Sequence, residues 1–259
     1  MALDSNGFIS IPPTIEFQAE FLSVIAAVSA SLISLLEKRL HSLYLYGSVA
    51  QGQAQSGVSD LDVCIVLTQS VSTSERHQLA DIALDITSRY PVVCKIDFDI
   101  GELSEVLDSE NGYSWGYWLK HHCRCIYGDD LAQRFQPFKP SQAIAIAVNG
   151  DFRVVLGEYI DQLTQRTERN EQKNIQRAAA RKLIRSTNLL RTDADNDWPD
   201  TLAEYVSRLV GRYPQKADEI DYFLRESIAP TDNAVSFIQH LTAFIGWLDT
   251  TCQSETDKR

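Results

Sequence analysis

Four acidic side chains in two short apolar segments are the residues of this chain best suited to chemistry. Asp60 and Asp62 open one segment, and Asp97 and Asp99 lie inside another. Successive side chains of a strand point to opposite faces, so the two members of each pair share a face. Close carboxylates repel one another, and a hard divalent cation such as Mg²⁺ keeps both ionised while it bridges to a phosphate. The spacing predicts metal-assisted phosphate chemistry.

A glycine and a serine lie just upstream of the first pair. Gly47 follows the apolar run 43–46, and eleven residues separate Ser48 from Asp60. Glycine allows a tight turn, and backbone N–H groups at the start of a short helix can hold phosphates. We therefore expect Gly47 and Ser48 to bind the triphosphate of a nucleotide.

The third acidic position is ambiguous from sequence. Lys95, Asp97 and Asp99 share one face of the segment 92–100. Either aspartate has the correct parity, and we favour Asp97 because it lies deeper in the strand. Lys95 is expected to pair with a neighbouring carboxylate, with phosphate binding as the alternative. The opposite face is apolar and consists of Cys94, Ile96, Phe98 and Ile100.

The elements that position these residues follow from periodicity. Apolar residues at helical spacing predict helices, and short apolar runs that end at turn residues predict strands. The expected order is a helix over 14–39, strands over 43–46 and 61–67, a helix over 74–90 and a strand over 92–100. This mixed order indicates an α/β (α+β) domain with a mixed sheet.

The second half of the chain has a different pattern. Two prolines in the segment 136–140 interrupt regular structure, and the periodicity beyond them is helical. We expect two domains, 1–138 and 139–259, the second an all-α bundle of four or five helices.

These motifs resemble a known family. The Gly47-Ser48 turn, the Asp60/Asp62 pair and a later strand carboxylate are similar to the nucleotidyltransferase domain of the DNA polymerase β superfamily. The layout, with the stretch 123–131 before a helical half, resembles the two-domain bacterial aminoglycoside adenylyltransferases. The resemblance implies a polymerase-β-like nucleotidyltransferase core followed by a helical domain that closes on substrate and nucleotide.

The resemblance also implies an activity. Such an enzyme transfers a nucleoside monophosphate, here AMP from ATP, to an acceptor hydroxyl and releases pyrophosphate. Asp60 and Asp62 would bridge two Mg²⁺ ions, and Asp97 would ligate the acceptor-side ion or accept the acceptor's proton. The family's helical domain contributes a cation to the phosphates, and Lys182 and Arg185 are the candidates here. A solvated helix face is the alternative reading of this basic stretch.

Charge bears on the acceptor. The formal net charge is -11, so a nucleic-acid partner is not expected. Residues 1–140 carry 9 Lys and Arg against 17 Asp and Glu, which favours a small cationic acceptor such as an aminoglycoside, and with it a role in antibiotic resistance. The alternatives are adenylylation of a protein or an RNA, docked on the basic region 166–191, and a non-catalytic nucleotide-binding regulator of the same fold.

The location follows from cysteine use and hydropathy. Five cysteines without a CxxC pair indicate neither a disulfide framework nor a thiolate zinc site. The uncharged run 21–36 contains four serines and is shorter than the roughly 20 apolar residues of a spanning helix. We expect a cytoplasmic protein without a membrane partner, and its oligomeric state stays open.

Overall fold

The computed structural model describes residues 3–257. They form two compact units, an α/β unit (9–138) and a helical unit (139–257 with 3–8). The outermost residues of the two expected domains, 1–2 and 258–259, lie outside the described residues. The α/β unit begins and ends at one place, because the backbone N–H of Ile9 donates to the carbonyl of Phe138 at 2.9 Å.

A four-stranded mixed sheet forms the centre of the α/β unit, in the order β3-β2-β1-β4. The strands are β1 (Leu40–Tyr46), β2 (Leu61–Leu67), β3 (Ile96–Glu102) and β4 (Arg124–Gly128). β1 pairs antiparallel with β2 and β4, whereas β2 and β3 are parallel. The expected α/β fold with a mixed sheet is confirmed.

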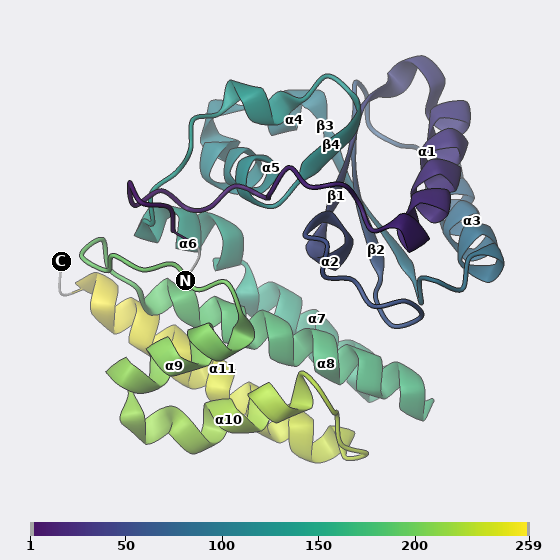
Figure 1. Ribbon diagram of the computed structural model, residues 1–259. Helices are drawn as coiled ribbons and strands as arrows, with labels where there is room; N and C mark the ends of the chain where they lie inside the picture. The colour runs from purple at the N-terminus through teal and green to yellow at the C-terminus, as the bar shows by residue number, and fades with distance from the viewer. Residues whose placement is uncertain (1–2, 258–259) are drawn as a thin grey trace. The chain divides into compact units, whose positions relative to one another are not determined.

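Helices cover both faces of this sheet, α1 and α3 on one side and α4 and α5 on the other (Figure 1). The helices are α1 (Leu22–Leu36), α2 (Gly47–Ala50), α3 (Thr73–Arg89), α4 (Leu103–Val106) and α5 (Tyr117–His121). Alternate residues of β2 enter different cores: Val63 and Ile65 pack in the cluster that includes α1 and α3, whereas Cys64 packs with α4 and α5. Asp62 has the parity of Cys64 and therefore faces the α4/α5 side.

One stretch of the described chain, Ala19–Arg39, is long and apolar enough to cross a membrane by length and composition. In the structure it contains α1, whose apolar face packs into the core against the sheet. The buried residues of this face are Val24, Ile25, Val28, Leu32 and Leu36. A core helix of a globular domain has this environment.

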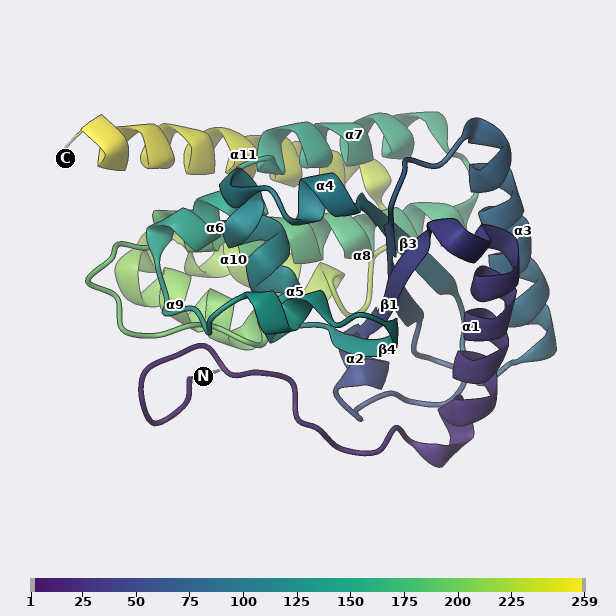
Figure 2. The same ribbon diagram turned by 90° about the horizontal axis from the view of Figure 1, so that it is seen from above.

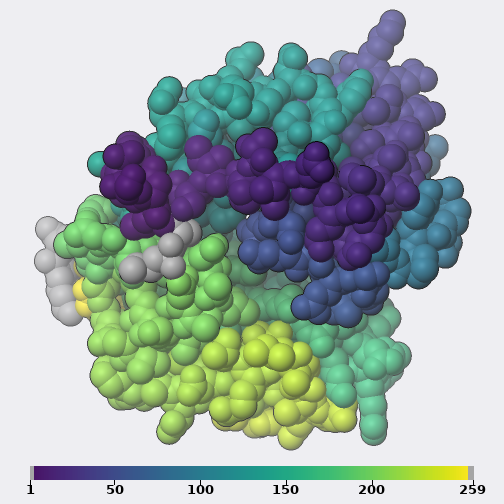
Figure 3. Space-filling view, in the orientation of Figure 1, coloured from purple at the N-terminus to yellow at the C-terminus, as the bar shows by residue number. Residues whose placement is uncertain are grey.

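The expected helix over 14–39 is wrong at its beginning. Residues 10–18 are extended and lie on the surface of the α/β unit (Figure 3), and α1 begins only at Leu22. Long-range contacts hold this segment. The Gln18 side chain exchanges two hydrogen bonds of 3.0 Å with the backbone of Ala54, and the Arg124 guanidinium donates to the carbonyl of Ile15. These contacts stabilise an extended backbone that local periodicity does not reveal.

The third strand is also displaced from its expected range. β3 runs from Ile96 to Glu102, rather than over 92–100. Residues 91–95 form a turn in which the N–H of Cys94 donates to the carbonyl of Ser59 at 3.1 Å.

The described part of the helical unit contains six α-helices, more than the four or five expected. They are α6 (Gln142–Asn149), α7 (Phe152–Gln165), α8 (Arg169–Ser186), α9 (Leu202–Arg212), α10 (Ala217–Glu226) and α11 (Ala234–Asp257). α8 contacts α7, α9, α10 and α11, and Figure 2 shows α7 and α11 running alongside one another. A short 3₁₀ helix, η6 (Thr187–Leu190), continues α8 directly.

Candidate active site

The register of β2 and β3 brings two predicted residues together. Asp62 and Asp97 are direct partners in this parallel pair, and Cys64 and Asp99 are the next partners on the same face. Neighbouring strands lie about 4.8 Å apart, so the Asp62 and Asp97 side chains emerge side by side.

Asp60 lies just before β2 and is fixed by the turn that precedes β3. The N–H of Leu61 donates to the carbonyl of Lys95 at 2.9 Å. The thiol of Cys94 donates to Oδ1 of Asp60 at 2.9 Å. Asp60 is thereby held at the same end of the sheet as Asp62 and Asp97.

Gly47 closes the other side of Asp62. Tyr46 pairs with Asp62 across β1 and β2, and Gly47 follows with φ +68°, in the left-handed region that favours glycine. A Cβ at Gly47 would stand 2.1 Å from Oδ2 of Asp62, so the Asp62 carboxylate occupies the space that a side chain would need. Gly47 and Ser48 open α2, and the first N–H groups of a helix have no acceptor within it. The structure therefore brings the expected phosphate-binding turn against the carboxylates.

The carboxylates share an unbalanced negative charge. The pKa of Asp62 is raised to about 7, first by burial and then by the nearby charges of Asp60, Asp97 and Asp99. Lys95 lies 2.6 Å from Asp97, which confirms the expected pairing with a carboxylate. Burial acts to lower the pKa of Lys95, but the bond to Asp97 and the neighbouring carboxylates raise it overall. A single ammonium group does not compensate this set of carboxylates.

Asp99 has a different partner from Asp97. The hydroxyl of Tyr46 donates a hydrogen bond to Oδ2 of Asp99, which is exposed. Trp118 packs edge-on against the Tyr46 ring at a centroid distance of 4.9 Å and supports it. Burial raises the pKa of Tyr46, and the bond to Asp99 raises it further, so the hydroxyl keeps its proton. This arrangement supports Asp97, the register partner of Asp62, as the third carboxylate.

Sequence reasoning missed Tyr46 and misplaced Cys94. Strand alternation put Cys94 on the apolar face, but Cys94 precedes β3 and is exposed, with its thiol on Asp60. Burial and then the bond to Asp60 raise the pKa of this thiol to about 11. No local signal marks either residue, because each acts on a carboxylate more than 30 positions away in the chain.

The side chains of the site can be compared with the ligands that the implied Mg²⁺ would need. Within residues 3–257 no three His, Cys, Asp or Glu side chains already converge as a metal-binding group. Asp60, Asp62 and Asp97 nonetheless offer the oxygen donors that a hard cation takes, and the raised pKa of Asp62 reports charge that a cation would neutralise. These three carboxylates fit a divalent cation, provided that Asp97 releases Lys95.

The two cations expected to contact phosphate lie on α8 of the helical unit. Lys182 is 19% exposed and its Nζ lies 2.7 Å from Oδ1 of Asp151, an ion pair within the same unit. Arg185 is exposed, and no carboxylate lies within ion-pairing distance of it in the described part of the chain. Arg185 is the cation of the two that is available to a ligand.

Comparisons with known proteins agree with this geometry. Residues 31–136 match the model of a family described as nucleotidyltransferase domain. The fold is similar to that of spectinomycin adenyltransferase AAD(9) from Enterococcus faecialis, solved with ATP and spectinomycin, with 15% sequence identity and a TM-score of 0.54. The similarity covers 86% of this chain and 98% of that one. No curated protein sequence matches the chain. The predicted resemblance to two-domain adenylyltransferases is confirmed at the level of the fold, and the nucleotidyltransferase domain matched by residues 31–136 supports an enzyme of this type.

Proposed function

We propose that this nucleotidyltransferase-type enzyme transfers AMP from ATP to a hydroxyl group of a small cationic molecule. The acceptor oxygen forms a bond to the α-phosphorus, the bond from that phosphorus to the β-phosphate oxygen breaks, and pyrophosphate and a proton leave. The observation that carries the proposal is the pairing of Asp62 with Asp97 against Gly47, inside the segment that matches the nucleotidyltransferase family.

Each group at the site has a role in this proposal. Asp60, Asp62 and Asp97 would hold two Mg²⁺ ions, which supply positive charge to the triphosphate and polarise the acceptor oxygen. The turn at Gly47 and Ser48 orients the β- and γ-phosphates through its N–H groups. In this proposal Asp97 ligates the acceptor-side ion or accepts the acceptor's proton.

The proposal gives each half of the chain a separate function. We propose that 1–138 is the catalytic domain and that 139–259 contributes to nucleotide and acceptor binding. Arg185 is exposed and has no acidic partner in the described residues, which favours it over Lys182 as the phosphate contact. The enzyme acts in the cytoplasm in this proposal.

The charge of the chain supports a cationic acceptor. Residues 1–140 carry 9 basic and 17 acidic residues, which attract a positively charged molecule. The structurally similar enzyme was solved with spectinomycin, and aminocyclitol and aminoglycoside antibiotics are the acceptors that we propose to test first.

Mass spectrometry of the reaction products tests this function. Purified protein is incubated with Mg²⁺, each of the four NTPs and a panel of aminocyclitols and aminoglycosides, with Asp62→Asn as the inactive control. We expect an AMP adduct on one class of antibiotic, pyrophosphate release, and neither product from the variant. An adduct on added protein or RNA would establish the alternative acceptor. Absence of any nucleotidyl transfer, with ATP still bound, would identify a non-catalytic nucleotide-binding protein.

A further inference from the structure

The C-terminal end of the short helix α2 is held by a distant part of the chain. α2 is a single helical turn, which is too short to be stable on its own. The carbonyls of its first three residues accept from the backbone of residues 51–53. The carbonyl of its last residue, Ala50, accepts from Nη1 of Arg124 at 3.0 Å. A cationic side chain on the last carbonyl of a helix stabilises that end.

Arg124 lies at the start of β4 and contacts two backbone segments at once. Its Nη1 donates to Ala50, and its Nη2 donates to the carbonyl of Ile15 in the extended segment 10–18. The guanidinium carbon lies 4.0 Å from the centroid of the Phe17 ring, which covers one face of the group. The donors of a guanidinium form a rigid planar fork, so one side chain can connect two carbonyls. Arg124 thereby connects α2 to the extended segment.

Two further contacts fix the same segment to the loop that follows α2. The Gln18 side chain exchanges two hydrogen bonds of 3.0 Å with the backbone of Ala54. Gly52 has φ +69°, and a Cβ there would lie 2.7 Å from Cδ1 of Ile15, so the Ile15 side chain occupies the space beside this glycine. The loop 51–54 cannot move away from the segment without losing these contacts.

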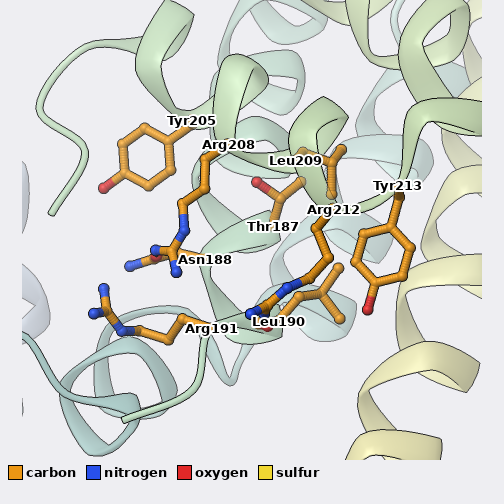
Figure 4. A pocket seen from close by; sticks show the side chains of 9 residues that line it. All are labelled: Thr187, Asn188, Leu190, Arg191, Tyr205, Arg208, Leu209, Arg212 and Tyr213. Atoms are coloured by element: carbon orange, nitrogen blue, oxygen red, sulfur yellow. Dashed lines mark hydrogen bonds between the residues drawn. The ribbon is translucent and has the colours of Figure 1, made fainter. Parts of the chain in front are cut away.

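Arg124 does not compensate a carboxylate. Figure 4 shows Arg208 and Arg212 on α9 of the helical unit, and these two pair with Asp195 at 2.6 and 3.2 Å. In the described part of the chain no carboxylate lies within ion-pairing distance of Arg124, whose polar contacts are the two carbonyls. Burial lowers the pKa of Arg124, but a guanidinium keeps its proton in proteins. Its charge-assisted hydrogen bonds therefore act on the position of the backbone.

We propose that Arg124 is a positioning residue for the phosphate-binding turn. This inference rests on the proposed function, in which the N–H groups of Gly47 and Ser48 bind the β- and γ-phosphates. α2 is held at its first residue by the packing of Gly47 on Asp62 and at its last residue by Arg124. A helix of four residues moves as one body, so fixing its C-terminal end keeps the N–H groups at its N-terminal end directed at the phosphates. Arg124 acts through α2, without contact to the nucleotide.

Binding of nucleotides with and without the outer phosphates tests this role. The Kd of ATP is measured by calorimetry with Mg²⁺ present and acceptor absent, and the Kd of AMP by competition with ATP. Arg124→Met removes both hydrogen bonds, so the Kd of ATP should rise at least about tenfold. The Kd of AMP should not change, because AMP lacks the phosphates that the turn binds.

Two more variants and one control refine the test. Arg124→Lys keeps the charge but cannot connect both carbonyls, so it should raise the Kd of ATP by a smaller factor. Gln18→Ala releases the loop after α2 and should act in the same direction. Arg39→Met removes an ion pair with Glu75 in the same unit, and it should lower Tm without changing either Kd.

The outcomes separate this inference from the proposed function. An equal rise in Kd for ATP and AMP in Arg124→Met, or no change in either, would refute the positioning role while the native protein still prefers ATP. If Arg124→Met does not fold, Arg124→Lys and Gln18→Ala are judged by the same comparison. A native protein that binds ATP no more tightly than AMP would remove phosphate binding from the turn, and the proposed function and this inference would fail together.

Discussion

Gly47 and Asp62 are in direct contact: the carboxylate of Asp62 fills the place where a side chain of residue 47 would start. A Cβ there would lie 2.1 Å from Oδ2 of Asp62, and the φ of +68° at Gly47 disfavours any other residue. The backbone of the predicted phosphate-binding turn and the Asp62 carboxylate, one of the predicted metal ligands, therefore pack directly against each other.

Gly47→Ala should lower activity because it displaces Asp62, and this loss should exceed what backbone strain alone causes. The left-handed conformation costs a non-glycine residue ~1–2 kcal/mol, and the displaced Asp62 should lower turnover at least ~100-fold. Gly57→Ala is the matched control, because Gly57 has φ +73° and a Cβ there would approach only the Pro91 carbonyl, at 3.6 Å. Both variants should lose similar Tm, and pyrophosphate release should fall in Gly47→Ala alone. Equal activity of the two would mean that Asp62 can move without loss.

Asp60→Asn and Asp62→Asn should fold normally and lose activity by several orders of magnitude. Each substitution keeps the shape of the side chain but removes one negative charge that the proposed cations need. The metal-free Tm should not fall, and Asp62→Asn should raise it, since close like charges oppose folding. Asp81→Asn, at an exposed position of α3, is the control for both measurements. Retained turnover in either active-site variant would refute the carboxylate mechanism.

Asp97→Asn and Asp99→Asn should differ. Asp97 is the register partner of Asp62, and its loss should match that of Asp62→Asn. An asparagine at position 99 still accepts the hydrogen bond of Tyr46, so we expect a tenfold loss or less, ~1.4 kcal/mol. Single-turnover measurements with a competent acceptor decide between them. A greater loss for Asp99→Asn would move the third carboxylate to that position.

Stability without metal should depend on pH through Asp62. Its pKa is about 7 in the folded protein and ~3.9 in an unfolded chain, so the folded state holds this proton more tightly. The contribution is therefore fully present below pH ~4 and is lost as the pH rises through about 7. Urea unfolding in chelator from pH 4 to 8 should show this decline, and Asp62→Asn should lack it. Mg²⁺ should restore more stability at pH 8 than at pH 6; an equal effect at both would exclude competition between metal and proton.

Lys182 should have a structural role, whereas Arg185 should bind the ligand. Lys182→Met and Asp151→Asn each break one partly exposed ion pair, so each should lower Tm by about 1–4 °C, and the double variant should lose no more. Neither should change the KM for ATP. Arg185→Met should leave Tm unchanged and raise that KM about tenfold. If Lys182→Met raises the KM as much, Lys182 leaves Asp151 to bind phosphate.

Local patterns predicted the parts of the fold that depend on local sequence. The alternation of β2 was predicted over its full range, 61–67, because every second side chain enters the core beside α1 and α3. The start of α1 was not predicted, since Arg124 and Ala54 hold the preceding segment extended from far along the chain. Pattern reasoning fails where a distant side chain outweighs local periodicity.

The residues of the candidate site also differ in whether local sequence could predict them. Asp60, Asp62 and Gly47 were identifiable because a turn and a strand parity fix them locally. Tyr46 and Cys94 were not, because their roles depend on the register of three strands.

The hydrogen bond between Ile9 and Phe138 has a consequence for how such a protein can change over time. The chain enters and leaves the α/β unit through neighbouring residues, so the first and last residues of this unit lie side by side. A short linker across this point would yield a circular polypeptide or a permuted order with little distortion. Because its two ends are adjacent, the α/β unit can be fused to a different partner domain without a change in the order or pairing of its strands. An α/β unit with adjacent ends can thereby be recombined with different helical units.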